Sequence, residues 1–419
     1  TNSLQERLAG ILAEKQKNLF VVGDGDQAIY GWRGAKMENI LNFEKKYPEA
    51  QTIVLERNYR STKNLVDAAN AVIEKNKNRK EKYSTTEKAA GEPIILHIAL
   101  NAEDEARWIA LRIKRQISDG RKPGEIAILY RTNFQSRALE EGLLRAGVPY
   151  KILGTRFFAR KEVKDALAWM RLAMDPSRET DKLRAAAVPP RGIGRVTLGK
   201  LAAGQRLSLR AGELAKIEAF EKIIRELALA AETLAPSEFV KLVVEKNGMK
   251  KSMLEEGSEE DKERFENIEE LASVAARHDS NPGKEGIALF IAESALASDQ
   301  DEMDQGEKTG VTLMTVHAAK GLEFNTVFIS GMEEGLFPHK NIGWNPPAGG
   351  DRDEEEERRL FYVAMTRAKD RLFLTLASIR KIYGSDSVTI PSSFLADIDS
   401  SLIKYDENDL HPEPQVIHF

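Results

Sequence analysis

The stretch EIAILYRTNFQSRALEEGLLRAGVPYKIL, residues 125–153, sets the expected fold of the chain. It opens with a predicted strand, EIAILY (125–130), whose last five residues are all apolar or aromatic, and continues through a helical pattern over 135–146 that Gly147 ends. A second apolar run, PYKIL (149–153), closes it. Continuous apolar strands that alternate with helices are typical of a mainly parallel sheet covered on both faces. The stretch therefore predicts an α/β fold.

The same alternation extends in both directions along the chain. Further strands are predicted at 19–23, 52–56, 93–100, 311–316, 326–331 and 371–377, with helices over 61–76 and 102–119. Between Gly154 and about residue 308 the pattern is almost entirely helical. We therefore expect one α/β domain that is interrupted by a helical insertion and followed by a C-terminal tail.

Composition narrows the class of protein. The 419 residues are 42% hydrophobic and contain no apolar run long enough to span a bilayer, so no membrane partner is expected. They contain no cysteine, which excludes disulfides and thiol catalysis and suits a reducing compartment. No signal peptide is recognisable, and the cytoplasm is the expected location. The net charge of −4 does not indicate nucleic acid, although a basic groove can exist on an acidic protein.

The start of the sequence predicts a helix that belongs to a larger protein. The first methionine is Met37, so we expect a fragment or a processed product. Ser3 and Glu6 have the spacing of a capping box, which predicts a helix start at this point.

An unusual set of side chains follows the predicted strand at 19–23. In VVGDGDQAIYGWRGA (21–35), a turn with two Asp is followed by Gln27, Tyr30, Trp32 and Arg33. The rings are consistent with core packing or with stacking on nucleic-acid bases, and Arg33 beside them favours the second interpretation. The Gln27 amide is suited to orienting a water or sensing a terminal phosphate.

Two further stretches carry polar groups next to predicted strands. LERNYRST (55–62) brings Tyr59 and Arg60 to a turn before a helix, which also fits an ordinary strand–helix junction that Ser61 or Thr62 would cap. VTLMTVHAAKGLEFNTVFISG (311–331) holds Thr315, His317, Lys320 and Glu323 between two strands. A single nearby His and Glu do not make a metal site, so no metal ligands are expected, and His317 is either structural or part of a ligand site.

Two helical stretches have both a structural and a functional interpretation. In DEEEERRLFYVAMTRAKDRL (353–372) the acidic start and basic end match the helix dipole, and Arg367 falls just before a strand, where it can project toward a neighbouring lobe. In PPRGIGRVTLGKL (189–201), paired glycines precede a helix start predicted at Thr197. That turn is either a plain connection or a place where backbone N–H groups approach a phosphate.

Taken in order, four of these stretches resemble the later motifs of the UvrD/PcrA/Rep helicases of superfamily one. They are VGDGDQAIYGWRGA, LERNYRST, VTLMTVHAAKGLEF and EEERRLFYVAMTRAKDRL. The resemblance implies a RecA-like parallel-sheet motor lobe interrupted by a mostly helical insertion, plus a remnant of a first RecA-like lobe. The expected boundaries are 1–57 for the remnant, 58–154 and 309–400 for the second lobe, 155–308 for the insertion and 401–419 for the tail.

The resemblance also implies roles for individual residues. Nucleotide contacts and catalysis would involve Gln27 as γ-phosphate sensor and Arg60 and Arg367 as arginine fingers, with Tyr59 stacked on adenine and Glu323 at the ribose. The cofactors would be ATP and Mg²⁺, and the partners single-stranded DNA and its junctions with duplex. DNA contacts would come from Tyr30, Trp32, Arg33, Arg131, Asn133, Arg156, Phe157, Phe158, Gly192, Gly194, Thr315 and His317.

One family feature is missing from the sequence. No G-x-x-x-x-G-K-[ST] motif occurs in the 419 residues, and GEKTG (306–310) lacks its length and preceding strand. We therefore expect the Mg²⁺ ligands and the phosphate-binding lysine in an N-terminal half that this chain needs as a partner. The leading hypothesis is part of a 3'-5' DNA helicase of repair or replication that is ATPase-inactive alone. The alternative is a non-catalytic DNA-binding or regulatory module.

Overall fold

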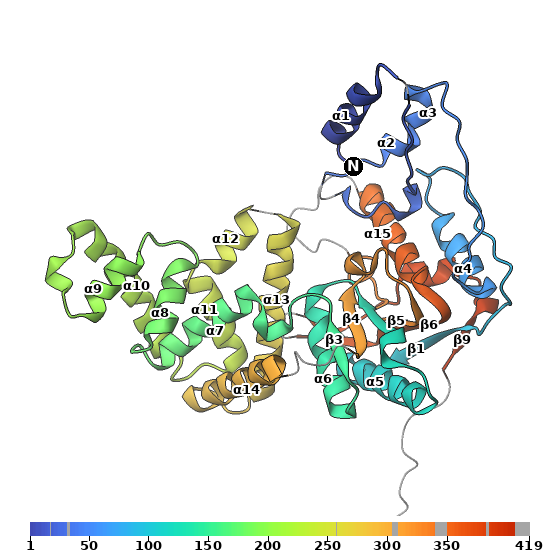
Figure 1. The fold of residues 1–419 in the computed structure, drawn as a ribbon. Coiled ribbons are helices and arrows are strands. Elements are labelled where there is room, and N and C mark those ends of the chain that lie inside the picture. Colours follow the sequence, from blue (N-terminus) through green and yellow to red (C-terminus); the bar gives the residue numbers. More distant parts are fainter. Residues whose placement is uncertain are drawn as a thin grey trace, which may run out of the picture. The chain divides into compact units, whose positions relative to one another are not determined.

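The computed structural model describes residues 1–16, 18–31, 34–256, 258–303, 309–339, 350–382 and 385–406. By its internal contacts the chain divides into two compact units (Figure 1). The first unit contains residues 1–153, 309–379 and 388–419, and the second contains residues 154–308 and 380–387. The second unit is thus inserted into the sequence of the first.

The first unit is built on a seven-stranded sheet whose strands all pair in parallel. Its order is β3-β4-β2-β5-β6-β1-β9, and β2 lies near the middle, where Ile128 is opposite Leu313 on one side and Phe328 on the other. The α/β class predicted from the sequence is confirmed. The strands are β1 (Ile94–Ala99), β2 (Ile126–Tyr130), β3 (Tyr150–Ile152), β4 (Val311–Thr315), β5 (Phe324–Ile329), β6 (Ala368–Ala377) and β9 (Ile403–Tyr405).

Helices cover both faces of this sheet, and alternate residues of β2 contact opposite layers. Ala127 and Leu129 belong to a core with α4 (Lys63–Ile73) and α15 (Gly350–Met365). Ile126, Ile128 and Tyr130 belong to a second core with α5 (Ala102–Ser118) and α6 (Ser136–Ala146). Because side chains of a strand alternate between its faces, a strand covered on both faces is apolar at every position. This explains the unbroken run EIAILY.

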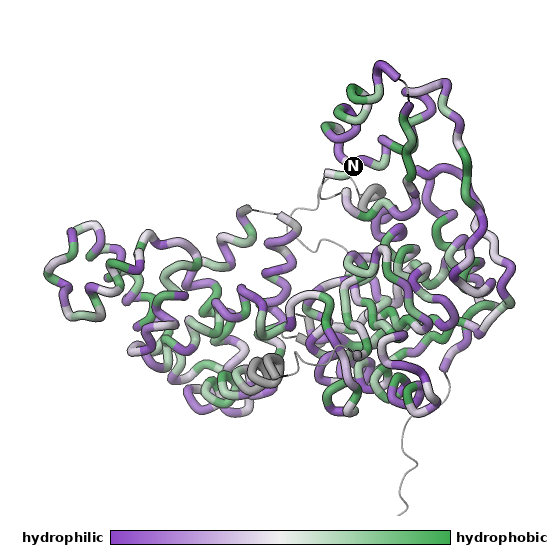
Figure 2. The backbone as a smooth tube through the Cα atoms, in the orientation of Figure 1, coloured by the Kyte–Doolittle hydropathy of each residue, from purple (hydrophilic) through white to green (hydrophobic). Residues whose placement is uncertain are grey.

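The strands predicted at 19–23 and 52–56 are wrong, because neither segment is a strand in the structure. The second segment ends at a single isolated bridge between Arg57 and Thr85, to which Glu56 contributes its backbone oxygen. Phe20 is 87% exposed and Leu55 is 81% exposed, so neither segment has a sheet to pack on. Figure 2 shows hydrophobic stretches in this N-terminal region as well as in the sheet. An apolar run becomes a strand only when a neighbouring strand supplies its hydrogen bonds.

The N-terminal region contains three short helices, α1 (Ser3–Ala13), α2 (Glu38–Leu41) and α3 (Phe43–Lys46). The predicted cap of α1 is one residue off. Asn2 and Gln5 form the capping box, with Gln5 N donating to Asn2 Oδ1 and Asn2 N to Gln5 Oε1, both at 2.9 Å. Four large apolar side chains of α1 are exposed, namely Leu4, Leu8, Ile11 and Leu12.

The second unit is helical, as the sequence pattern over 154–308 predicts. It packs around a core in which the Trp169 ring meets Phe220 edge to face at 5.2 Å. Its helices are α7 (Lys161–Met174), α8 (Glu179–Ala187), α9 (Arg195–Ala202), α10 (Ala211–Ala230), α11 (Pro236–Lys246), α12 (Met249–Glu256), α13 (Glu259–Ala275) and α14 (Lys284–Met303).

A small hairpin departs from the expected boundaries. Strands β7 (Ile379–Ile382) and β8 (Ser385–Val388) pair with each other and not with the seven-stranded sheet. Residues 380–387 consequently group with the helical unit, although the sequence places them in the segment 309–400 of the second lobe. In the part of the chain that the structure describes, no helix is both long enough and apolar enough to cross a bilayer.

Candidate functional site

Arg60, Glu323 and Arg367 come together although they are far apart in the sequence. Arg60 precedes α4, Glu323 directly precedes β5, and Arg367 directly precedes β6. The Arg60 Nε donates to Glu323 Oε2 at 2.7 Å, and its Nη1 donates to the carbonyl oxygen of Thr366 at 3.0 Å. Lys369 Nζ lies 2.6 Å from Glu323 Oε1. One carboxylate is therefore shared by two cations.

Arg367 is a buried cation with uncharged acceptors. Its side chain is 2% exposed, and its guanidinium donates to the carbonyl oxygens of Val363 and Leu322 and to Thr366 Oγ1 at 3.0–3.1 Å. Burial, followed by the nearby charge of Arg60, lowers the pKa of Arg367 to about 10. The positive charge of Arg367 is not neutralised by these acceptors, so the cluster favours an anion nearby.

The charges around Glu323 also favour an anion near the cluster. Hydrogen bonds from Lys369 and then from Arg60 lower the pKa of Glu323 to about 2. The carboxylate is therefore ionised at neutral pH and fixes both cations in place. Arg60, Arg367 and Lys369 carry three positive charges against this single negative charge, which leaves the cluster with excess positive charge.

The cluster lies at the opposite ends of the strands from Thr315 and His317. Ligands of open α/β sheets generally bind at the carboxyl ends of strands, where Thr315 ends β4 and His317 follows it. Glu323 and Arg367 instead stand at the amino ends of β5 and β6. The segment 316–323 explains the difference, because it runs from the carboxyl end of β4 to the amino end of β5. It therefore places polar groups at both ends of the parallel strands.

The Gln27 turn is joined to this segment. Residues Gly25–Gln27 form a short 3₁₀ turn, and the Gln27 side-chain Nε2 donates to Asp24 Oδ2 at 2.7 Å. Lys320 Nζ donates to the backbone oxygen of Gln27 at 2.7 Å. Burial, together with the charge of Arg367, lowers the pKa of Lys320, while Asp24 opposes this effect. Lys320 lies two residues before Leu322, whose oxygen accepts from Arg367, so one short segment contacts both the turn and the cluster.

Tyr30 contacts the other end of the same segment. Its hydroxyl donates to the backbone oxygen of His317 at 3.1 Å, and the two rings have centroids 6.4 Å apart. Lys320 Nζ lies 5.3 Å from the Tyr30 ring centroid, within range of a cation–π interaction. Thr315 is half-buried at the end of β4, where its Oγ1 accepts from the Ala318 N–H at 3.4 Å. Trp32 and Arg33 lie outside the described residues.

The remaining expected residues of the first unit have different environments. Tyr59 is 74% exposed, and the Arg57 guanidinium lies 4.9 Å from its ring centroid. Arg131 follows β2 and makes a bidentate pair with Glu357, with an Nη2–Oε1 distance of 2.7 Å and both side chains nearly buried. Asn133 begins the 3₁₀ turn that leads into α6.

In the second unit, the expected roles of Phe157 and Phe158 are not supported. Their side chains are 1% and 8% exposed, and the rings pack edge to face at 5.0 Å in the helical core. A base cannot stack on a ring that the core already covers on both faces. Arg156, directly before them, is half-buried.

The glycine turn of the second unit has the geometry that its sequence predicts. Gly192 has φ +65°, in the left-handed region that favours glycine. Gly194 is the N-cap of α9, which begins at Arg195, two residues earlier than the predicted start at Thr197. A side chain at Gly192 would meet Lys216 Nζ at 2.7 Å. Both glycines are exposed, so their backbone groups are accessible.

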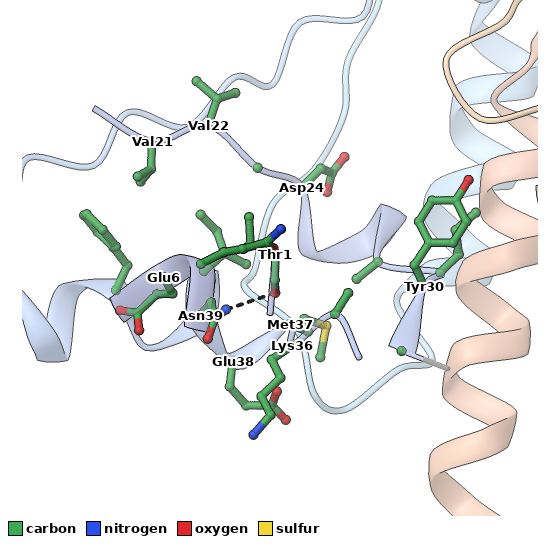
Figure 3. A pocket seen from close by; sticks show the side chains of 18 of the residues that line it. Thr1, Glu6, Val21, Val22, Asp24, Tyr30, Lys36, Met37, Glu38 and Asn39 are labelled. Atoms are coloured by element: carbon green, nitrogen blue, oxygen red, sulfur yellow. Dashed lines mark hydrogen bonds between the residues drawn. The ribbon is translucent and has the colours of Figure 1, made fainter. Parts of the chain in front are cut away.

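A cavity of about 710 Å³ lies beside the Gln27 turn in the N-terminal region. Figure 3 shows Val21 and Val22 on one side of it and Glu6 and Asn39 on the other, with Asn39 Nδ2 donating to the Thr1 oxygen at 3.1 Å. Its walls are mainly segments 1–9 and 19–47 rather than the Arg60 cluster. Among the described residues, no group of three His, Cys, Asp or Glu side chains could hold a metal ion.

Several contacts of this site were missed from the sequence. Lys369, which pairs with Glu323, stands inside the quoted stretch 353–372 but was not singled out there. Arg79 and Lys82, which bind Asp26 and Asp24, lie in a charged loop with no periodic pattern to single them out.

Comparison with known proteins adds the family context. A family model described as UvrD-like helicase C-terminal domain matches residues 53–379, and one described as UvrD/REP helicase N-terminal domain matches residues 1–48. The chain is 42% identical over 422 residues to the ATP-dependent DNA helicase PcrA of Staphylococcus epidermidis and 41% identical to that of Staphylococcus aureus strain MRSA252. Each alignment covers 96% of this chain and 57% of the relative.

The chain therefore spans 57% of the length of these curated relatives. Among solved structures, it is similar to the C-terminal domain of a possible DNA helicase from Lactobacillus plantarum WCFS1, with a TM-score of 0.34 and 12% identity over 84% of this chain and 99% of that one. A TM-score this low supports no conclusion about fold or function.

Proposed function

Because the chain belongs to the UvrD-like helicase family, we propose that it forms part of an ATP-dependent DNA helicase. Its parent would couple ATP hydrolysis to 3'-5' movement on single-stranded DNA and to duplex unwinding in repair or replication. The observation that carries the proposal is the cluster of Arg60, Glu323 and Arg367, which has excess positive charge. The segment 320–323 joins it to the Gln27 turn, because Lys320 binds the Gln27 backbone oxygen and the Leu322 oxygen accepts from Arg367.

The residues of this cluster fit an ATP phosphate chain. Arg60 and Arg367 would act as arginine fingers, which stabilise the charge that develops on the transferred phosphoryl group and contribute about 10³–10⁵ in rate. Gln27 would sense the γ-phosphate once its amide leaves Asp24. The exposed Tyr59 ring would cover the adenine, and Glu323 would contact the ribose.

Mg²⁺ does not fit the described part of this chain, because no cluster of acidic side chains there could hold it. We expect its ligands, and the lysine that binds the β- and γ-phosphates, in residues outside these 419. The chain alone would then not hydrolyse ATP, since arginine fingers without a bound phosphate chain have nothing to stabilise.

The exposed apolar side chains of residues 1–57 indicate where such additional residues would pack. Phe20, Val22, Ile53 and Leu55 and the apolar face of α1 are all exposed. Strands that pair with the extended segments around 20 and 53 would bury them and complete a first lobe.

Single-stranded DNA would lie along the carboxyl ends of β2 and β4. Stacking of a base on an aromatic ring contributes about 1–3 kcal/mol, which gives Tyr30 and Trp32 the largest individual effects. The glycine turn with Gly192 and Gly194 would contact the duplex through its backbone. The remaining proposed contacts are Arg33, Arg131, Asn133, Arg156, Thr315 and His317.

Two assays on the purified 419-residue chain test this proposal. Binding of a fluorescent oligo(dT) is expected, and Tyr30→Ala, at a half-buried ring, should weaken it about tenfold, whereas Tyr83→Ala, at an exposed ring, should not. ATP hydrolysis is expected to be absent with or without Mg²⁺ and DNA. Mg²⁺-dependent, DNA-stimulated hydrolysis that Arg60→Ala abolishes would contradict the proposed division of the site.

The alternative, a DNA-binding module without a motor role, makes a different prediction. It retains DNA binding but places no demand on Arg60 and Arg367. Joining the chain to a P-loop half of a relative would then produce no ATPase activity that depends on these two arginines.

A further inference from the structure

The loop that follows α4 holds the Gln27 turn through a buried ion pair. Arg79 donates from Nε to Asp26 Oδ1 at 3.2 Å and from Nη2 to Asp26 Oδ2 at 2.9 Å. The two side chains are 9% and 2% exposed. A bidentate pair of this kind fixes both the distance and the orientation of the carboxylate, since the guanidinium is planar.

A second cation extends this pair to Asp24. Lys82 Nζ donates to Asp24 Oδ1 and lies 3.5 Å from Asp26 Oδ2. The Arg79 Nη2 also donates to the backbone oxygen of Lys82 at 3.2 Å, so the two basic residues are fixed relative to each other. Two cations of one loop therefore face two carboxylates of the turn.

Asp24 connects the Lys82 cation to the Gln27 side chain. Its Oδ1 accepts from Lys82, while its Oδ2 accepts from the Gln27 amide at 2.7 Å and so holds that side chain. The backbone N–H groups of Gln27 and Ala28 bond within the turn, to Asp24 O at 3.2 Å and Gly25 O at 3.1 Å, and the Asp26 N–H donates to Asp24 Oδ1 at 3.0 Å. These bonds are local, so the contacts that fix the turn to the rest of the unit come from side chains, namely Arg79, Lys82 and Lys320. The segment before it, 19–23, has no strand pairing that could fix the turn.

Stability alone does not account for such a cluster. A buried ion pair costs desolvation, and replacing it with apolar side chains of similar volume is often neutral or stabilising. What such a replacement removes is the fixed geometry, because apolar groups pack without a directional bond.

We propose that Arg79 and Lys82 are positioning residues that seat the Asp24–Gln27 turn and thereby set the direction of the Gln27 amide and the Tyr30 ring. The proposal rests on the function proposed above for those two side chains. It adds that the position of the phosphate sensor depends on a loop more than fifty residues later in the sequence.

Hydrogen exchange of the 419-residue chain, read by mass spectrometry on peptides covering residues 21–31, tests the positioning directly. Arg79→Met is expected to speed exchange of these peptides about tenfold and to leave peptides of β2 unchanged. Lys80→Met is the matched control, since the neighbouring Lys80 pairs with Glu44 at the surface. Equal exchange in the Arg79→Met and Lys80→Met variants would overturn the proposal.

The double variant Asp26→Leu/Arg79→Met separates positioning from stability. Its thermal midpoint is expected to return toward the wild-type value, while exchange of residues 21–31 stays fast and oligo(dT) binding stays weakened about fivefold. Recovery of exchange and affinity together with stability would show a merely structural pair and would overturn the proposal.

The Lys82→Met variant tests the positioning independently of the double variant, including the case in which the double variant does not fold. It retains the Asp26–Arg79 pair and removes the cation that binds Asp24 and lies 3.5 Å from Asp26, so exchange of residues 21–31 should rise about threefold. No rise would overturn the role of Lys82. The exchange measurements need no DNA, so a wild-type chain that fails to bind oligo(dT) would count against the proposed function and not against the positioning.

Discussion

Strand β2 and the segment at 19–23 have similar apolar sequences, but only β2 forms a buried strand of the sheet. Every residue of β2 is buried, because β4 and β5 pair with it and helices cover both of its faces. The segment at 19–23 is extended, has no strand partner and leaves Phe20 almost fully exposed. The comparison shows that apolar residues specify a capacity to form a strand, and that the neighbouring strands decide whether it forms.

The same contrast separates the two parts of the candidate site. Arg367 and Glu323 are held at the amino ends of β6 and β5 in the seven-stranded sheet by bonds to residues of α15 and β6. The Gln27 turn extends from an incomplete region and is held by side chains of other segments, chiefly Arg79, Lys82 and Lys320. The nucleotide-binding half that we propose would complete the second part and leave the first almost unchanged.

The largest effect is expected from a pair of matched phenylalanine truncations. Phe328 is fully buried and stacks on Phe373 with ring centroids 4.4 Å apart, so Phe328→Ala should lower the free energy of unfolding by about 3–5 kcal/mol. Phe20→Ala should change it by less than about 0.5 kcal/mol, because the ring is already in water. Urea unfolding of the α/β unit measures both. Similar losses in the two variants would mean that residues 19–23 are packed in solution.

A smaller effect is expected from removing the charge of one arginine in each region, the nearly buried Arg131 after β2 and the exposed Arg57 in the N-terminal region. Arg131→Met leaves Glu357 nearly buried without its cation and should cost about 3 kcal/mol. Arg57, in the N-terminal region, pairs with Glu87 at the surface, and Arg57→Met should cost less than about 1 kcal/mol. The comparison fails if urea unfolding gives equal costs for the two variants.

The smallest effect is a pH dependence of the folding stability that arises from Glu323, at the amino end of β5. The pKa of Glu323 is lowered to about 2 in the folded protein, against about 4.3 in an unfolded chain. A lowered carboxyl pKa stabilises the fold above the unfolded value, and this contribution disappears as the pH falls from about 5 to 2. Glu323→Gln should therefore be less stable than wild type at pH 6, with a difference in thermal midpoint that shrinks toward pH 3. A difference independent of pH would exclude this carboxylate as the cause.

Much of the α/β unit could be predicted from the sequence, because alternation of apolar strands and helices is local. The strands near 94–99 and 126–130 and the glycine that ends α6 follow directly from it. The strands at 19–23 and 52–56 were wrong because pairing partners are not local. Strand β9 and the hairpin of β7 and β8 were missed because they are only three or four residues long and, unlike β3, are not followed or preceded by a clear helical pattern.

The site was predicted unevenly for a similar reason. The motif resemblance named Arg60, Glu323 and Arg367, and the structure brings these three side chains together, although their functions stay predictions. Phe157 and Phe158 show the limit, since a pair of rings before a helix has the same sequence whether it faces DNA or the core. Their burial follows from the packing of α7, α11, α13 and α14, which no local pattern reveals.

One measurement tests the central claim, that the Arg60–Arg367 cluster serves an ATP whose phosphates are held by other residues. The 419-residue chain is mixed with the separately produced P-loop half of the Staphylococcus epidermidis relative, and DNA-stimulated ATP hydrolysis is measured. The account predicts hydrolysis only in the mixture, and a loss of about 10³-fold or more with Arg60→Ala or Arg367→Ala. Hydrolysis by the mixture that neither substitution reduces would contradict it.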